Sequence, residues 1–314
     1  SDRVAACLDH EQPNYSEFIQ THWKDFFAEL APHSRILDIG TGNGAVATIA
    51  NEVSHTQNLG FDIHGIDTAK IDPHKFVQHD SVLLDGITFH AEAAAESTPF
   101  PDAFFHAVSG QYALEYTRIE DTIKELTRIT QVGAKMRFIV HSKDSIAVET
   151  AHTDLEQCRL LLEKSKILDK AQDMMDFVAD IERGHLQATP AVDKKALQLI
   201  KKFEQAAREI SAALKQTVRK SMYSNVLEVT IKTHENRRKF SKQHILNNIE
   251  SLRAEVKAHR GRLEALVKSA KDQAEMEEIE VMLEKYGLRH VDTEEVIDPQ
   301  RDTQFGWRLD AEKQ

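Results

Sequence analysis

The stretch RILDIGTGNGAVA, residues 35–47, decides the fold. It begins with the short apolar run Arg35–Ile39, which carries Asp38 near its end, and it continues with alternating glycines at Gly40, Gly42 and Gly44. The alanine-rich segment Ala45–Glu52 then suits a helix. Strand, glycine loop and helix in this order predict the opening of a βαβ unit. Because glycine has no Cβ, such a loop can turn sharply and lets a ligand press against its backbone.

Outward from this stretch, apolar runs of strand length alternate with helical patterns. Helices are expected at residues 15–31, where Pro32 stops the pattern, and at Ile119–Ile129. The expected strands are Phe61–Ile66, Ile87–Ala91, His106–Ser109 and Met136–Val140, the last preceded by a turn at Gly133. This alternation favours an α/β fold with a parallel sheet.

From about Ser145 to Tyr286 the sequence is charged and rich in alanine and leucine, with Gly184, Pro190 and Gly261 as its only glycine or proline residues. It carries two apolar stripes at helical spacing: Leu197, Ile200, Phe203, Ala207, Ile210 and Leu214, and then Ile245, Ile249, Leu252, Val256, Leu263, Leu266 and Ala270. Antiparallel helices packed as a lid explain these stripes, and so does a coiled coil that forms a homodimer. Both can hold at once.

Strand patterns return after Gly287, at Leu288–Ile297 and Phe305–Leu309, and they indicate a closing hairpin. We therefore predict one domain made of residues 1–145 and 280–314. An all-helical insertion at residues 146–279 interrupts it.

Charge and composition narrow the range of partners. The net charge of −11 argues against broad electrostatic binding to DNA or to an anionic membrane. The two cysteines, Cys7 and Cys158, lie too far apart for a disulfide framework or a cysteine-rich zinc site. Ser1–His10 has no signal-peptide pattern, and no apolar run approaches the roughly 20 residues that span a bilayer. We expect a soluble cytoplasmic protein.

The acid before the glycine loop distinguishes two kinds of ligand. Gly40, Gly42 and Ala45 also satisfy the dinucleotide pattern G-x-G-x-x-G/A, in which a helix N-terminus receives a pyrophosphate. A carboxylate at Asp38 would repel that pyrophosphate, whereas it would attract a cofactor with an ammonium and a sulfonium group.

These residues resemble the first motif of the class I methyltransferases that depend on S-adenosylmethionine (SAM). The resemblance implies a Rossmann-like, mostly parallel seven-stranded sheet, with SAM as cofactor and S-adenosylhomocysteine (SAH) as product. It also implies that the loop contacts SAM through Asp38, Gly40, Gly42, Asn43 and Gly44. Asp67, after the second strand, matches the acid that holds both ribose hydroxyls, and two carboxylate oxygens suit two neighbouring hydroxyls.

The stretch AEAAAESTPFPDAFFHAVSGQYALEY, residues 91–116, resembles the third-to-fourth-strand region of the same superfamily. The acid that usually binds adenine is displaced here, because Ala94 falls near its place and Glu92 and Glu96 flank it. Backbone groups at Ala95 and the Glu96 side chain are the candidates for adenine, and exposed loop acids are the alternative. Gln111 is a further candidate cofactor contact.

Ligands of open α/β sheets bind beyond the carboxyl ends of the strands, so the ends of the fourth and fifth strands should face the methyl group. His141 is a candidate general base, and Glu115 and Tyr116 are candidates for orienting the acceptor. A histidine bonded within the strand end and an acid at a helix start are the structural alternatives. Tyr15, Phe18 and Trp23 could cover the cofactor or pack in the core. No histidine and acid pattern predicts a metal site.

The sequence thus predicts a SAM-dependent methyltransferase that acts on an oxygen or nitrogen of a small-molecule acceptor. RNA or protein is the alternative acceptor, and it would require a continuous basic patch from Lys194, Lys195, Lys201 and Lys202, or from Arg237, Arg238 and Lys239. A non-catalytic SAM-binding scaffold that dimerises through its helical arm is the alternative of a different class.

Overall fold

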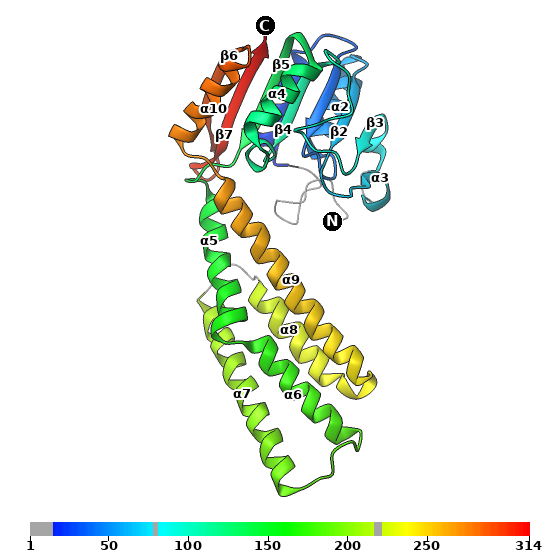
Figure 1. Ribbon diagram of the computed structural model, residues 1–314, viewed down its shortest axis with the longest axis vertical. Helices are drawn as coiled ribbons and strands as arrows, with labels where there is room; N and C mark the ends of the chain where they lie inside the picture. Colours follow the sequence, from blue (N-terminus) through cyan, green and yellow to red (C-terminus); the bar gives the residue numbers. More distant parts are fainter. Residues whose placement is uncertain (1–14, 78–80, 217–221) are drawn as a thin grey trace. The chain divides into compact units, whose positions relative to one another are not determined.

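The structure is a computed structural model that describes residues 15–77, 81–216 and 222–314. Ser1–His10 and Cys7 lie outside the described residues. The described chain divides into two compact units, Ser1–Val148 with Ser269–Gln314, and Glu149–Lys268. Figure 1 shows the sheet of the first unit and the long helices of the second.

The first unit is built on a seven-stranded sheet in the order β3-β2-β1-β4-β5-β7-β6. The first five strands in the chain pair in parallel, and β7 is antiparallel to both β5 and β6. The strands are β1 (Arg35–Ile39), β2 (Asp62–Ile66), β3 (Ile87–His90), β4 (Phe105–Gln111), β5 (Thr130–Val140), β6 (Leu288–Asp298) and β7 (Thr303–Lys313). The α/β fold and the closing hairpin match the sequence prediction.

Helices cover both faces of the sheet because the strands at its centre are apolar on both sides. Ile36 of β1 packs in one core with α1 (Glu17–Ala28) and α2 (Ala45–Gln57). Its neighbour Leu37 packs in the other core with α4 (Ile119–Ile129) and α10 (Gln273–Lys285). This burial on both faces is typical of parallel strands. Three short helices lie in the connections: α3 (Pro73–Phe76), η1 (Ser81–Leu84) and η2 (Leu114–Tyr116).

Several element boundaries differ from the expectation, and two of the differences affect the sheet and the division of the chain. Gly133 lies within β5 rather than in a turn before it, and the pairing of β5 with β4 shifts register between Phe105 and Ala107. The insertion was expected to end at residue 279, which lies inside α10. The structure assigns α10 to the first unit, because Met276, Ile279 and Leu283 are buried in the core beside α4.

The second unit is helical and has its own apolar core. Its elements are α5 (Ile146–Arg159), the π-helical turn η3 (Leu160–Lys164), α6 (Ile167–Glu182), α7 (Pro190–Lys215), α8 (Met222–Glu235), η4 (Arg237–Lys239) and α9 (Lys242–Ser269). Ile245, Ile249, Leu252 and Val256 of the second stripe are buried in this core. Gly261 lies inside α9 without interrupting it. These four residues therefore pack within the chain. The homodimer stays a prediction.

No helix among the described residues has both the length and the apolar character needed to cross a bilayer. The described cysteine, Cys158, is a buried free thiol.

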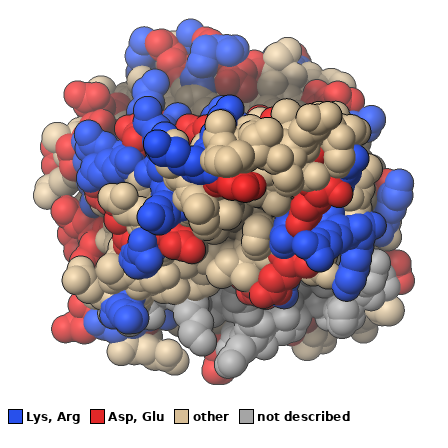
Figure 2. Space-filling view, turned by 90° about the horizontal axis from the view of Figure 1, so that it is seen from below, with Lys and Arg blue, Asp and Glu red and all other residues tan. Residues whose placement is uncertain are grey.

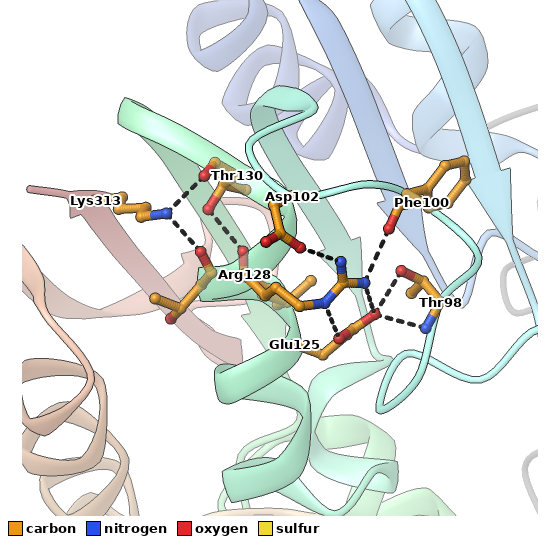
Figure 3. A network of polar contacts seen from close by, with 9 residues as sticks. Thr98, Phe100, Asp102, Glu125, Arg128, Thr130 and Lys313 are labelled. Carbon is orange, nitrogen blue, oxygen red and sulfur yellow. Dashed lines mark hydrogen bonds and ion pairs between the residues drawn. The ribbon is translucent and has the colours of Figure 1, made fainter.

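A polar network joins α4 to the segment between β3 and β4 (Figure 3). Arg128 donates to the Asp102 carboxylate at 2.6 Å, to the Phe100 carbonyl oxygen at 2.9 Å and to Glu125 at 2.7 Å. Glu125 also accepts from the backbone N–H and the hydroxyl of Thr98, both at 2.7 Å. Burial opposes the ionisation of Glu125, but the hydrogen bonds from Arg128 and Thr98 outweigh it and lower its pKa to about 2. The network holds residues 98–102 against α4.

Glu125→Ala should lower the free energy of unfolding by about 2 kcal/mol at pH 7, because it leaves the Thr98 N–H and the guanidinium without their shared acceptor. The folded pKa lies below the unfolded one, so the stabilisation is present above about pH 4.5 and is lost as pH falls toward 2. Urea unfolding at pH 7 and pH 3 measures both effects. Arg118→Ala, which removes an exposed partner of Asp121, is the control, and equal losses in the two variants would contradict the argument.

Candidate cofactor and active site

The glycine loop begins where β1 ends, and its backbone excludes side chains at two positions. Gly40 has φ +60°, and a Cβ there would lie 2.6 Å from the Cβ of Ala113, so the loop touches the segment that follows β4. Gly42 has φ +54°, and a Cβ there would meet no described atom within 4 Å. Both values lie in the left-handed region that favours glycine. One glycine therefore permits a close approach of two chain segments, and the other leaves open space over the loop.

Asp67 fixes the shape of this loop from the end of β2. One carboxylate oxygen accepts from the N–H of Gly42 at 2.9 Å, and the other accepts from the N–H of Ala69 at 2.8 Å. The Asp67 carbonyl oxygen accepts from Ala93, so the ends of β2 and β3 are joined at the same place. A carboxylate oxygen has more than one lone pair, which leaves capacity for the two hydroxyls of a ribose. The geometry is compatible with the predicted ribose contact.

Asp38 lies beneath the loop and is only 1% exposed. Its Oδ1 accepts from the hydroxyl of Ser109 on β4 at 2.9 Å. Burial raises the pKa of Asp38 to about 7, and the nearby charge of Asp67 acts in the same direction, while the bond from Ser109 opposes it. Of the other loop candidates, Asn43 is half-buried, and Gly44 is the N-cap of α2. Asp38 thus joins β1 to β4 through Ser109, and its contact with the cofactor stays a prediction.

The two adenine candidates occupy different environments. Ala95 is buried in the core that contains α4. Glu96 accepts from the backbone N–H of Arg118 at 3.0 Å, which satisfies a donor at the start of α4. The flanking acid, Glu92, is exposed and has φ +56°. The Glu96 carboxylate therefore already has a structural partner, and the adenine contact stays a prediction.

Gln111, the last residue of β4, is tied to the N-terminal helix. The indole N–H of Trp23 donates to Gln111 Oε1 at 2.7 Å, and the side chains come from positions 88 residues apart. Trp23 is fully buried and Gln111 is 6% exposed. Gln111 Nε2 is buried and has no hydrogen-bond partner among the described residues. Trp23 thus packs in the core, which was one of the two alternatives from the sequence. It also orients the Gln111 amide at the carboxyl end of β4.

His141 and Glu115 form a buried pair at the ends of β5 and β4. Glu115 Oε1 lies 2.7 Å from His141 Nδ1 and also accepts the backbone N–H of His141 at 2.8 Å. The Glu115 side chain is 0% exposed, and its Oε2 has no hydrogen-bond partner in the part of the chain that the structure describes. Glu115 therefore orients the imidazole rather than facing outward as an acceptor ligand would. This carboxylate and histidine arrangement leaves Nε2 as the ring nitrogen that could take up a proton.

Aromatic rings surround this pair. Tyr112 stacks on His141 with ring centroids 3.6 Å apart, and Tyr116 meets it edge-on at 5.9 Å. Tyr112 also donates from its hydroxyl to the Phe305 carbonyl oxygen at 3.2 Å, which brings β7 to the same site. Tyr116 is 44% exposed and is the outermost of the three catalytic candidates.

The sequence did not reveal the contribution of β7. Ser142 donates to Gln304 Oε1 at 2.7 Å across 162 residues. Gln304 Nε2 is buried, and no residue within 15–77, 81–216 or 222–314 is its hydrogen-bond partner. Only the antiparallel return of β7 beside β5 brings these residues together. The alternation in the final strands signals a hairpin, but no local pattern tells which strand it joins.

Comparison with known proteins matches the part of the first unit that contains the glycine loop, Asp67, Gln111 and Glu115. Residues 37–138 match the family model described as a methyltransferase domain. The ubiquinone/menaquinone biosynthesis C-methyltransferase UbiE of Xanthomonas oryzae pv. oryzae is 24% identical over 168 residues, covering 52% of this chain and 65% of that protein. The protein of the same description from Stutzerimonas stutzeri is 27% identical over 187 residues, covering 58% and 72%. The chain thus spans less than two thirds of the first of these relatives.

Solved structures give partial matches. The YcgJ protein from Bacillus subtilis is 21% identical and covers 44% of this chain and 59% of its own, with a TM-score of 0.32. A geranyl diphosphate methyltransferase in complex with GPP and sinefungin is 18% identical and covers 38% and 43%, with a TM-score of 0.33.

The stability of Asp38→Asn should increase relative to that of the wild type as the pH rises. The unfolded carboxyl ionises near its usual 3.8 and the folded one near 7, so the folded state binds more protons between these values and the wild type loses stability as pH increases through this window. Asparagine can still accept from Ser109 but never ionises. We therefore expect the difference between the unfolding free energies of the variant and the wild type to shift by about 2 kcal/mol in favour of the variant between pH 5 and pH 8.

Chemical unfolding of both proteins at several pH values measures this difference. Asp62→Asn, at the exposed start of β2, is the matched control and should run parallel to the wild type. Parallel curves for Asp38→Asn as well would show that its carboxyl ionises normally.

Proposed function

We propose that this chain, whose residues 37–138 match a methyltransferase domain, is a class I SAM-dependent methyltransferase and transfers a methyl group from SAM to a nucleophile that His141 deprotonates. The Glu115 and His141 pair carries this proposal, because a buried carboxylate that orients an imidazole is an arrangement suited to proton removal. The acceptor we favour is an oxygen or nitrogen of a small molecule.

The residues present fit the cofactor. Gly42 leaves open space over the loop, and Gln111, at the end of the neighbouring strand β4, has an amide donor without a partner among the described residues. Asp67 has lone pairs left for the ribose, and Asp38 lies below the place where a cation would bind. When bound, SAM supplies an electrophilic methyl group on a sulfonium. The chain's own part is to position the acceptor, exclude water and hold the released proton.

The proton-accepting step follows from the contacts of His141. Glu115 Oε1 accepts from Nδ1–H, which leaves the lone pair of the neutral ring on Nε2. Nε2 would take the proton of the acceptor as the acceptor attacks the methyl group. The carboxylate then stabilises the imidazolium that results. Tyr112 restricts the ring to one plane by stacking on it.

A carbon acceptor is the second candidate, because the curated relatives are described as C-methyltransferases. The same pair could remove a proton from an acidic hydroxyl conjugated with a nucleophilic ring carbon. Incubation with SAM and separate phenol, amine and hydroquinone panels distinguishes the classes, since mass spectrometry of the product locates the new methyl group on oxygen, nitrogen or carbon.

A macromolecular acceptor has less support. Arg237 and Arg238 both pair with Glu182, at 2.9 and 3.0 Å, which reduces the net charge of that cluster. Lys194, Lys195, Lys201 and Lys202 of α7 are all exposed. On the face seen in Figure 2, basic and acidic side chains alternate rather than forming one continuous basic area. We therefore place the small-molecule acceptor first.

Asp67→Ala should weaken SAH binding at least tenfold, about 1.4 kcal/mol, because it removes the ribose acceptor and releases the N–H of Gly42. Isothermal titration calorimetry with SAH measures the dissociation constant. Asp62→Ala, an exposed acid on the same strand, should bind SAH as the wild type does. Absence of SAH and SAM binding in the wild type would refute the methyltransferase proposal.

Glu115→Gln and His141→Gln should each slow methyl transfer by about 10²- to 10⁴-fold, while SAH affinity stays within about twofold of the wild type. SAH formation is measured with the acceptor that the panels identify, and calorimetry measures binding. Tyr116→Phe should have a much smaller effect, since Tyr116 meets His141 only edge-on. Full activity of His141→Gln would show that acceptor positioning alone drives the reaction.

A further inference from the structure

We propose that the helical unit contains a ligand site of its own, for a small molecule with a planar aromatic ring and an anionic oxygen group. The site is a cavity of about 430 Å³ lined by Glu182, Arg183, Arg238 and Phe240. Small-molecule sites typically have volumes of roughly 300–1,000 Å³. All four lining residues belong to the helical unit, Glu149–Lys268, and lie outside the residues that match the methyltransferase domain.

Arg183, the C-cap residue of α6, supplies a fixed cation. Its guanidinium donates to the Phe240 carbonyl oxygen at 2.7 Å and to the Ala179 carbonyl oxygen at 3.1 Å. No carboxylate among the described residues pairs with it. A guanidinium has five N–H groups, so these two bonds hold Arg183 in place and leave donors for a ligand. The planar fork of such a group matches the paired oxygens of a carboxylate or a phosphate.

Glu182 is the acid that lines the cavity, and its charge is already balanced. Its Oε1 accepts from Arg237 at 2.9 Å and from Arg238 at 3.0 Å. Burial opposes the ionisation of Glu182, but the hydrogen bonds from Arg238 and Arg237 outweigh it and lower its pKa. One carboxylate therefore lies among three guanidinium groups, since Arg183 is the third. The positive charge that remains favours an anion.

Phe240 supplies an exposed aromatic surface beside these cations. It is 43% exposed, although it is a large apolar residue. His244 stacks on its ring with centroids 4.6 Å apart, which supports the ring from one side. Aromatic side chains bind planar rings by stacking. Because Arg183 bonds to the backbone of Phe240, a ring stacked on Phe240 would place an attached carboxylate or phosphate beside the guanidinium.

Arg183 also has a purely structural explanation. Basic side chains often bond to the last carbonyl groups of a helix, and Ala179 lies in the last turn of α6. That explanation does not account for the bond to Phe240, 57 residues away, or for the exposed ring that this bond holds beside the cation. The two explanations differ in what they predict for ligand binding.

The test compares ligands that have both chemical features with ligands that have one. Phenyl phosphate and benzoate have a ring and an anion, whereas inorganic phosphate has only the anion and benzyl alcohol only the ring. We expect phenyl phosphate to bind about tenfold more tightly than either single-feature ligand in calorimetry. Excess SAH is present so that the predicted cofactor site is filled. Uridine monophosphate and benzoate distinguish a nucleotide from an aromatic acid as the source of this chemistry.

Two variants separate the contributions of the cation and the ring. Arg183→Gln keeps amide donors for the two backbone carbonyls but removes the charge, and Phe240→Leu keeps an apolar side chain without the ring. Each should weaken phenyl phosphate binding by about tenfold. Arg208→Gln is the control, because it removes an exposed arginine of α7 that pairs with Glu204, and it should bind phenyl phosphate as the wild type does. Thermal unfolding checks that each variant is folded.

Several outcomes would overturn the inference. Equal affinities for phenyl phosphate and inorganic phosphate would show that the ring contributes nothing. Wild-type affinity in Arg183→Gln, with a lower midpoint of thermal unfolding, would show that Arg183 only caps α6. A short oligouridylate that binds more tightly than uridine monophosphate, and that loses affinity in the same variants, would make RNA the ligand. A wild type that binds none of the small molecules would also overturn the inference. The methyltransferase proposal is tested separately by SAH binding, so the two can fail independently.

Discussion

The site depends on the close approach of the glycine loop to the segment after β4. A Cβ on Gly40 would lie 2.6 Å from the Cβ of Ala113, so any other residue would push the two segments apart. Ala113 is followed within two residues by Glu115, which holds His141. The parallel pairing of Asp38 in β1 with Ser109 in β4 fixes the distance between the two segments that follow these strands. The same contact therefore locates the cofactor loop and the proposed base relative to each other.

Three buried polar pairs surround that contact: Asp38 with Ser109, Glu115 with His141, and Gln111 with Trp23. Burial of polar groups is unfavourable unless they are hydrogen-bonded, and in two of these pairs one atom still has no partner. Glu115 Oε2 and Gln111 Nε2 are those atoms. A ligand bound beside the glycine loop could complete the bonding of these two atoms, whereas the other unpartnered buried atoms, such as Thr122 Oγ1 and His234 Nδ1, lie elsewhere in the fold.

The helical unit, residues Glu149–Lys268, has a different physical basis. Residues from both apolar stripes, among them Phe203, Ile210, Ile249 and Val256, belong to one buried core within this unit. Packing inside the chain thus accounts for Ile245, Ile249, Leu252 and Val256 of the α9 stripe. Leu197 of the α7 stripe, in contrast, is 58% exposed. The role of this unit as a lid or as a dimerising arm stays a prediction.

Local patterns in the sequence were sufficient to predict most of the helices and strands and the class of cofactor. Ile119–Ile129 and Arg35–Ile39 have the same bounds in the structure, because apolar periodicity and the adjoining glycine loop are properties of neighbouring residues. The motif around Gly40 and Gly42 indicated SAM for the same reason. Only the tertiary structure decided that Glu115 orients His141, that Glu96 bonds to the start of α4, and that Trp23 and Gln304 reach the sheet edge. These contacts join residues 22 to 162 positions apart, and they arise from strand order and register, which no local pattern encodes.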